Sequence, residues 1–297
     1  MARIVAIDIG GTTMKSAVVD APATLADTVI GEVRRTPTPI GDADRLVRTV
    51  AELVTGYGPV DGVGVVMPGV LDVPNGRVRA AGNMRLFDVP IVEPLQALLG
   101  LPISFEHDVR AGAWAELHAG AARGRRDVAF LPIGTGIAAA FIIDGEVRSA
   151  DGYMGEVGHA YVGPDEPCVC GLRGCLEAIA SASAIARRYA AGGGSGEAPQ
   201  VIARAAAGEP LASRVWNEAL DGLALACSWM AQLLGPEAII IGGGLARAGD
   251  ALFTPLRVRL HSRLTYQRAP QLLPAVHGDD AGCLGAAVLA LRAQGVR

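Results

Sequence analysis

Arg3-Ile-Val-Ala-Ile-Asp8-Ile-Gly-Gly-Thr-Thr13 is an apolar run rich in β-branched residues that ends in a glycine turn. The run predicts a buried strand, and Lys15–Val19 after the turn predicts its antiparallel partner. Glycines allow close backbone approach, amides and threonine hydroxyls can donate to phosphate oxygens, and Asp8 can hold Mg²⁺ through water. The stretch therefore indicates a phosphate-handling turn. An ordinary hairpin turn is the alternative, because Gly-Gly favours such turns in any protein.

The same pattern recurs twice further along the chain. Val128–Ile133 ends in Gly134-Thr-Gly136, and Ile239–Ile241 runs into Gly242-Gly-Gly244. Three glycine turns, each after an apolar strand, suggest one polyphosphate nucleotide lying between two units. The sequence contains no Gly-x-x-x-x-Gly-Lys-Ser/Thr, which excludes a P-loop. It also contains no Gly-x-Gly-x-x-Gly that opens a helix followed by a ribose-binding acid, which disfavours a dinucleotide-binding fold.

Strands and helices alternate along both halves of the chain. This alternation predicts an α/β protein with a mostly parallel sheet in each of two units, and ligands in such folds bind beyond the carboxyl ends of the strands. We therefore expect two facing sheets that share one cleft. Further strands are predicted over 29–35, 63–67, 103–106 and 138–143, and helices over 42–57, 91–99, 108–119, 176–190, 199–207, 211–234 and 282–292.

Composition narrows the class of protein. The 297 residues are 51% hydrophobic, which is ample for two domains of ordinary size. A net charge of −4 without a long basic run argues against nucleic-acid binding. The N-terminus lacks the pattern of a secretion signal, and no apolar run reaches the length of a membrane span. We expect a cytoplasmic protein that binds neither nucleic acid nor membrane.

The cysteines are concentrated in His159-Ala-Tyr-Val-Gly-Pro-Asp-Glu-Pro-Cys168-Val-Cys170-Gly-Leu-Arg-Gly-Cys175-Leu-Glu177. One imidazole and three thiolates are the tetrahedral donor set that Zn²⁺ prefers. Four protein ligands leave no open coordination position, so the predicted site, His159, Cys168, Cys170 and Cys175, is structural. Cys227 and Cys283 lie in apolar helical patterns and are expected to be buried.

Two groups of polar residues are candidates for the chemistry. Glu106-His107-Asp108 lies where a strand ends and a helix begins, so Asp108 is either a helix N-cap or a general base. Glu156, His159 and Glu177 flank the cysteines and could bind sugar hydroxyls, which need several fixed acceptors, or they could be surface charges beside a zinc loop. Asn83 in a polar loop is a further candidate ligand, although a lone loop Asn is more often a turn residue.

These motifs together resemble the ROK family (repressor, open reading frame, kinase). The resemblance covers nearly the whole chain, and its most specific part is the His–Cys–Cys–Cys motif. The other matching segments are Asp8-Ile-Gly-Gly-Thr-Thr-Met-Lys15, Met67-Pro-Gly-Val-Leu-Asp72, Glu106-His-Asp108, Gly134-Thr-Gly136, Gly155-Glu-Val-Gly-His159 and Gly285-Ala-Ala-Val-Leu-Ala290.

The resemblance implies two actin-like (ribonuclease H-like) domains with an interdomain cleft. The small domain would be 1–119 plus the C-terminal helix 281–297, and the large domain 120–280 with the zinc loop. The resemblance further implies an ATP-dependent kinase that phosphorylates a hexose at its 6-hydroxyl, most simply glucose, and that forms a homodimer.

The resemblance also implies a role for each matching residue. Asp108 would be the catalytic base, and Asp8 would act with it around Mg²⁺. The sugar would be held by Gly69, Asn83, His107, Asp108, Glu156, His159 and Glu177. ATP would be bound by Asp8, Gly10, Gly11, Thr12, Thr13, Lys15, Gly134, Thr135, Gly136, Gly243 and Gly244.

Two departures from the family pattern leave alternatives open. The family usually has Asn-Asp where this chain has His107-Asp108, and imidazole offers a different donor and acceptor arrangement from an amide. A kinase for an amino or N-acyl hexose (N-acetylmannosamine, N-acetylglucosamine or kanosamine) is therefore the main alternative. The second departure is Ala138-Ala-Ala140 after the second turn, where the family more often has glycines.

Three further alternatives are a kinase that uses polyphosphate instead of ATP as its phosphate donor, a sugar sensor without catalytic activity, and a transcriptional repressor. ROK repressors carry a DNA-binding domain before the first glycine turn, and here that turn begins at residue 8.

Overall fold

A computed structural model describes residues 2–297, which form two compact units. Unit 1 contains the described residues up to Arg123 together with Ser149–Met154 and Asp279–Arg297, and unit 2 contains Gly124–Arg148 and Gly155–Gly278. Each unit is built on a five-stranded mixed sheet. Within residues 2–297, no helix combines the length and the apolar character that crossing a bilayer requires.

The large sheet of unit 1 has the order β3-β2-β1-β4-β8. β1 and β2 form the predicted antiparallel hairpin, β3 pairs with β2, and β4 and β8 run parallel to β1. β4 is buried along its whole length, as expected for a central parallel strand. The bounds are β1 Arg3–Ile9, β2 Thr13–Asp20, β3 Arg34–Pro37, β4 Gly62–Met67 and β8 Ile103–His107.

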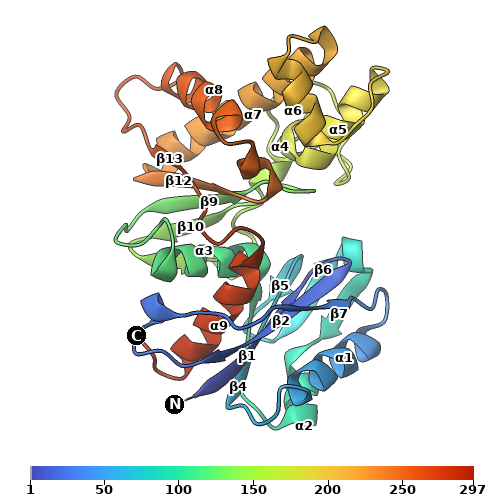
Figure 1. Cartoon of the computed structure of the whole chain (residues 1–297), viewed down its shortest axis with the longest axis vertical. Coiled ribbons are helices and arrows are strands. Elements are labelled where there is room, and N and C mark those ends of the chain that lie inside the picture. The colour runs from blue at the N-terminus through green and yellow to red at the C-terminus, as the bar shows by residue number, and fades with distance from the viewer. Residues whose placement is uncertain (1) are drawn as a thin grey trace. The chain divides into compact units, whose positions relative to one another are not determined.

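Side chains of β1 alternate between two helix layers of unit 1. Val5, Ile7 and Ile9 join the hydrophobic core formed with α1 (Ala43–Thr55) and α2 (Val92–Leu99). The intervening residues face α9 (Ala281–Ala293), which lies along β1 and β4 and also packs on α3 (Asp108–Ala119) (Figure 1). Asp42, the first residue of the helix predicted over 42–57, is the N-cap of α1: its side chain accepts a hydrogen bond from the Arg45 amide.

Glycine allows α9 to approach its neighbours closely. A Cβ on Gly64 of β4 would lie 1.9 Å from the Ala286 carbonyl oxygen of α9. A Cβ on Gly285 of α9 would lie 2.0 Å from the Ala111 carbonyl oxygen of α3. Because both obstacles are backbone atoms, no side-chain rotation could relieve either clash.

Unit 1 also contains a small antiparallel sheet in the order β5-β6-β7, which the sequence did not predict. Its strands are β5 Val70–Asp72, β6 Arg77–Ala81 and β7 Leu86–Pro90. A 3-10 turn over Gly82–Met84 connects β6 to β7. The small sheet therefore carries the segments that contain Gly69 and Asn83.

The sheet of unit 2 has the order β11-β10-β9-β12-β13. β10 pairs antiparallel with both β9 and β11, and β12 runs parallel to β9 and β13. The bounds are β9 Val128–Pro132, β10 Ala140–Ile143, β11 Glu146–Arg148, β12 Ala238–Gly242 and β13 Gln271–Pro274. This is the second strand hairpin with a glycine turn that the sequence predicts.

The helices of unit 2 pack into one core with the sheet. The longest, α7, packs against α4, α5, α6 and α8. The bounds are α4 Leu176–Ala180, α5 Ala182–Ala191, α6 Ala198–Ala206, α7 Pro210–Leu234 and α8 Asp250–His261. Cys227 of α7 is fully buried, as is Cys283 of α9 in unit 1, and both were expected to be.

Two sequence-based predictions of local structure need correction, and one helix was not predicted. The strand expected over 29–35 begins only at Arg34, because the preceding residues do not pair with β2 in a ladder. The helix expected over 176–190 is interrupted at Ser181, whose side chain accepts a hydrogen bond from the Ala184 amide and starts α5. Helix α8 was not predicted, and it contains Pro255 in its interior.

The close approach of α9 gives a prediction about stability. Gly285→Ala should lower the free energy of unfolding by about 2 kcal/mol or more, because the added methyl overlaps a backbone carbonyl. Gly56→Ala is the matched control: a Cβ there would lie 3.4 Å from its nearest neighbours, an ordinary contact. Urea denaturation of both variants measures the difference, and equal stabilities would contradict the packing described for α9.

Candidate active site

Strands β1 and β8 of unit 1, which lie on either side of β4 and run parallel to it, bring acidic residues to one end of the large sheet. Asp8 of β1 aligns with Val66 of β4, and Val66 aligns with Glu106 of β8. His107 ends β8, and Asp108 follows as the first residue of α3. The carboxyl ends of parallel strands therefore place Asp8 and Asp108 together, as the topology predicts.

Asp8 lies in a confined and electrostatically unusual position. Its carboxylate is 3.8 Å from the Lys15 Nζ, and Lys15 also donates a hydrogen bond to the Asp279 carbonyl oxygen. A Cβ on Gly282 would lie 2.6 Å from the Asp8 Oδ2, so glycine makes room for the carboxylate at the start of α9. Burial, followed by the charge of Asp108, raises the pKa of Asp8 to about 7, although Lys15 acts in the opposite direction.

His107, not Asp108, is the N-cap of α3: its Nδ1 accepts a hydrogen bond from the Val109 amide at 3.2 Å. The same amide lies 2.7 Å from the Asp108 Oδ1, and His107 Nδ1 is 3.1 Å from that oxygen. Burial raises the pKa of Asp108 to about 6, while the Val109 amide and the charge of Arg110 lower it. An aspartate with a pKa in this range can accept a proton near neutral pH.

A buried ion pair behind Asp108 was not found from the sequence. Arg110 is only 3% exposed, and its Nε lies 2.7 Å from Glu106 Oε1. The same oxygen accepts a hydrogen bond from the His107 amide at 2.7 Å. The i,i+4 spacing of Glu106 and Arg110 could have suggested this pair, but spacing does not reveal burial.

The first glycine turn is held by neighbouring elements of unit 1. The Gly10 amide donates to the Thr13 carbonyl oxygen at 3.1 Å, and the Thr38 hydroxyl donates to the Gly10 carbonyl oxygen at 2.7 Å. A Cβ on Gly11 would lie 2.9 Å from the Asn83 Nδ2. Asn83, a predicted sugar ligand, therefore lies beside the turn that contains Gly10, Gly11, Thr12 and Thr13.

Gly69 lies in the same region of unit 1. Its φ is +117°, and a Cβ there would lie 2.5 Å from the Ala80 carbonyl oxygen and 3.0 Å from the Ala81 Cβ. Only glycine combines this backbone conformation with such close contact to β6. Asn83 follows β6 by two residues, so both of these candidate sugar ligands are attached to the small sheet.

The two glycine turns of unit 2 contact each other. A Cβ on Gly243 would lie 2.4 Å from the Ile133 carbonyl oxygen, which also accepts a hydrogen bond from the Leu245 amide at 3.0 Å. A cavity of about 330 Å³ opens beside them, lined by Ala182, Ala198, Pro199, Ile202, Gly244, Leu245, Arg247 and Ala248. The predicted cradle of Gly134, Thr135, Gly136, Gly243 and Gly244 therefore adjoins a largely apolar pocket of the size of a small-ligand site.

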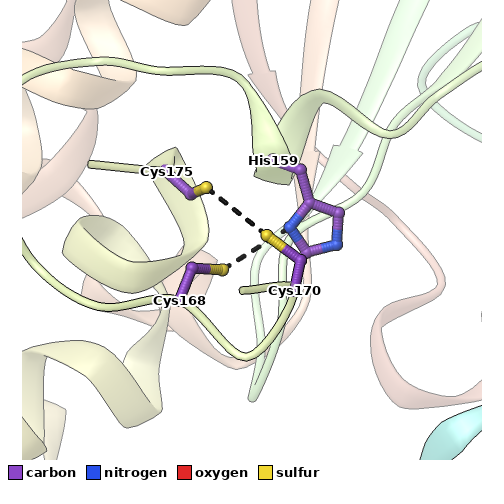
Figure 2. Close-up of side chains that lie close together, drawn as sticks. All are labelled: His159, Cys168, Cys170 and Cys175. Carbon is purple, nitrogen blue, oxygen red and sulfur yellow. Dashed lines mark hydrogen bonds between the residues drawn. The ribbon is translucent and has the colours of Figure 1, made fainter. Parts of the chain in front are cut away.

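The four predicted zinc ligands converge in unit 2 (Figure 2). Their donor atoms all lie within 4.8 Å of one another. His159 Nδ1 is 3.6 Å from Cys168 Sγ, and Cys170 Sγ is 3.7 Å from Cys175 Sγ. Ligands about 2.3 Å from a tetrahedral zinc ion lie about 3.7 Å apart, so the residues fit the metal.

The chemistry of the cluster also favours a cation. Burial, with the neighbouring Cys170 and Cys168, raises the pKa of the Cys175 thiol to about 12, whereas hydrogen bonding from the Leu172 amide lowers the pKa of Cys170. Three thiolates so close together repel one another unless a metal neutralises them. Cys175 is buried and Cys170 is exposed, so the cluster lies at the surface of the unit.

The two glutamates beside the cluster differ in their contacts. Glu156 Oε2 is 3.9 Å from His159 Nε2, the ring nitrogen that faces away from the cysteines. Glu177 Oε2 accepts a hydrogen bond from the Ile137 amide at 2.9 Å, directly after the second glycine turn. The link between Glu177 and this turn was not predicted, because the two segments are 40 residues apart.

Comparison with known proteins identifies the family. Residues 4–293 match the model of the ROK family. The chain is 32% identical to a glucokinase from Thermotoga maritima (96% of this chain, 96% of the relative) and 32% identical to an N-acetylmannosamine kinase from Citrobacter koseri (96% and 97%). It also matches the crystal structure of a ROK family glucokinase from Streptomyces griseus in complex with glucose and AMPPNP, with a TM-score of 0.81, 30% identity and coverage of 98% and 99%.

The chain therefore belongs to the ROK family, and it is similar over nearly its full length to sugar kinases of that family. The predicted fold class is confirmed: the two five-stranded mixed sheets are those of the actin-like fold seen in ROK hexokinase structures.

The cluster predicts a response to chelation. Removing zinc should loosen the 159–177 segment and abolish activity, because no other covalent or metal link fixes this loop within residues 2–297. Cys170→Ser should lower the zinc content, whereas Cys227→Ala, which changes a buried thiol outside the cluster, should leave it unchanged. Elemental analysis and limited proteolysis measure both effects. Active protein without zinc would contradict the assignment.

The raised pKa of Asp8 predicts a pH-dependent stability. Between about pH 4 and pH 7 the folded state holds a proton that the unfolded state has released, so this group makes stability fall as pH rises through that window. Asp8→Asn cannot ionise and should be more stable than wild type at pH 8, by about 1–3 kcal/mol, with the difference shrinking towards pH 4.

Asp72→Asn is the control, because the pH dependence of stability expected from Asp72 is opposite to that expected from Asp8. The pKa of Asp72 is lowered by its hydrogen bond from the Asn75 side chain, so its contribution is present at neutral pH and is lost as pH falls. Thermal unfolding from pH 4 to pH 8 measures both variants. A difference between Asp8→Asn and wild type that stays constant with pH would contradict the buried position of Asp8.

Proposed function

We propose that this protein transfers the γ-phosphoryl group of ATP to the 6-hydroxyl of a hexose, with glucose as the favoured substrate. The observation that carries the proposal is the position of Asp108, which lies at the carboxyl edge of the unit 1 sheet beside Asp8 and has its pKa raised to about 6. A general base for this reaction needs a partly desolvated carboxylate at such a position.

In the proposed reaction the Asp108 carboxylate accepts the proton of the sugar 6-hydroxyl. The sugar oxygen forms a bond with the γ-phosphorus while the bond from that phosphorus to the β–γ bridging oxygen breaks, and ADP leaves. Mg²⁺, when bound, neutralises charge on the phosphates. Asp8 is the proposed residue that holds it through water, and Lys15, 3.8 Å from Asp8, adds positive charge to the same region.

Several features of the chain support nucleotide binding. The first glycine turn of unit 1 is closed by the bond between the Gly10 amide and the Thr13 carbonyl oxygen and carries the hydroxyls of Thr12 and Thr13, and the two glycine turns of unit 2 adjoin the 330 Å³ cavity. The largely apolar lining of that cavity suits the adenine and ribose of ATP, and glycine amides suit its phosphates.

The proposed sugar ligands come from the same two units. Gly69, Asn83, His107 and Asp108 belong to unit 1, and Glu156, His159 and Glu177 belong to the zinc loop of unit 2. His159 would serve two purposes: Nδ1 faces the cysteines, and Nε2 remains on the side of Glu156. The cytoplasm is the proposed location, because ATP and reduced cysteines occur there together.

A second candidate is a kinase for an amino or N-acyl hexose. It is favoured by His107, which replaces the amide usual in the family, and by relatives named N-acetylmannosamine kinase that are as similar as those named glucokinase. In this chain the His107 Nδ1 caps α3, so the imidazole cannot offer that nitrogen as a free acceptor to a sugar hydroxyl.

Replacement of Asp108 tests the proposed base. Asp108→Asn should lower kcat by about 10²–10⁴-fold while hexose binding persists, because the amide cannot accept the proton. In the wild type, kcat/KM should fall below about pH 6, where the carboxylate becomes protonated. Asp144→Asn, which removes an exposed surface carboxylate, is the control and should leave turnover unchanged. Near-normal turnover in Asp108→Asn would remove this residue from the mechanism.

The identity of the sugar requires a separate measurement. A coupled assay of ADP release against glucose, mannose, N-acetylmannosamine, N-acetylglucosamine and kanosamine should give the highest kcat/KM for glucose. Highest efficiency with an N-acyl or amino sugar would favour the second candidate, and His107→Asn should then shift preference towards glucose. Sugar binding without ADP release would indicate a sensor instead of an enzyme.

A further inference from the structure

Glu177 connects the zinc loop to the second glycine turn. Its Oε2 accepts the Ile137 amide hydrogen bond at 2.9 Å, and a Cβ on Gly136 would lie only 2.6 Å from this oxygen. The carboxylate therefore rests directly on the end of the Gly134–Gly136 turn. One of its two oxygens is committed to the protein backbone and not to a substrate.

The other end of the zinc loop packs on the residues that follow the turn. The Ala139 amide donates to the Gly155 carbonyl oxygen at 2.8 Å. A Cβ on Gly158 would lie 2.0 Å from the Ile137 carbonyl oxygen, so the segment that leads to His159 contacts this backbone without any intervening side chain. Residues 137–139 consequently lie against both ends of the 155–177 loop.

The beginning of α5 completes the support of the turn. The Ala182 amide donates to the Gly134 carbonyl oxygen at 2.8 Å, and the Ser183 hydroxyl donates to the Thr135 carbonyl oxygen at 2.5 Å. Together with Glu177, these contacts satisfy three backbone groups of a turn that would otherwise rely on water. All three supporting residues follow Cys175 by eight positions or fewer.

The cluster ligands are adjacent to these supports. Cys175 is the N-cap of α4, and Glu177 lies in the first turn of that helix. The Leu176 amide donates to the Ala160 carbonyl oxygen at 2.9 Å, which joins the two ends of the loop next to His159 and Cys175. A metal that bridges His159 and Cys175 would therefore fix both segments that hold the turn.

We propose that Glu177 is a positioning residue through which the His159–Cys175 loop holds the Gly134–Gly136 turn, so that the metal cluster supports nucleotide binding as well as sugar binding. This inference rests on the proposed assignment of the turn to the phosphates of ATP. It assigns Glu177 a role that is measurable without any sugar. A carboxylate is the strongest available acceptor for the amide, because hydrogen bonds to charged groups exceed neutral ones.

The test compares Glu177→Ala, Glu177→Gln and Glu156→Ala, each zinc-loaded and free of ligands. Hydrogen exchange at the Ile137 amide should accelerate about tenfold or more in Glu177→Ala, and less in Glu177→Gln, whose amide oxygen can still accept. The affinity for AMPPNP with Mg²⁺, measured calorimetrically without sugar, should fall about fivefold in Glu177→Ala. Glu156→Ala, which removes a carboxylate on the same loop that does not touch the turn, should change neither quantity.

Chelation of the wild-type protein supplies an independent test. Removal of zinc should accelerate exchange across 134–139 and weaken AMPPNP binding in the absence of sugar, and this holds even if Glu177→Ala fails to fold. The inference would be overturned if hydrogen exchange at the Ile137 amide stayed at the wild-type rate both after chelation and in the folded Glu177 variants. Failure of the proposed function would look different: the wild type would not bind AMPPNP or phosphorylate any hexose, while the exchange effects persisted.

Discussion

The constraint on which unit 1 depends is the burial of two aspartates at one edge of a sheet. Burial raises the pKa of both carboxyl groups, to about 7 for Asp8 and about 6 for Asp108, and the negative charge of Asp108 adds to the shift of Asp8. Such an arrangement weakens the fold and is tolerated where function needs it. The surrounding structure partly offsets this loss of stability. Lys15 lies beside Asp8, and the Val109 amide donates a hydrogen bond to Asp108. Gly282 leaves room for the Asp8 carboxylate at the start of α9.

In unit 2 the main constraint is the ordering of the glycine-rich turn Gly134–Gly136. Glycine permits close approach to phosphate, but it also leaves the backbone with many conformations to lose on binding. Contacts from Glu177, Ala182 and Ser183 hold the turn in advance, and the His–Cys₃ cluster lies where it can fix the segment that provides them. Preorganisation of this kind increases affinity because less entropy is lost when the ligand binds.

The sequence predicted those features that depend on local pattern. The hairpins, the helices on either side of β8, and the convergence of His159 with three cysteines all follow from periodicity and short spacing, and each is present.

The small sheet was missed because its strands have only three to five residues and their pattern is set by pairing with one another. Helix α8 was missed because Pro255 argues against a helix interior. The contacts of Arg110 with Glu106 and of Glu177 with Ile137 depend on burial and on distant segments, which no local pattern encodes.

The central claim is that the Asp108 carboxylate takes the proton from the sugar hydroxyl that is phosphorylated. A crystal structure of the protein with glucose and AMPPNP measures the decisive geometry. The account predicts the glucose 6-oxygen within hydrogen-bonding distance of an Asp108 carboxylate oxygen, with the γ-phosphate on the opposite side of that oxygen. Glucose bound with its 6-hydroxyl directed away from Asp108, or a nucleotide whose γ-phosphate lies far from this residue, would contradict it.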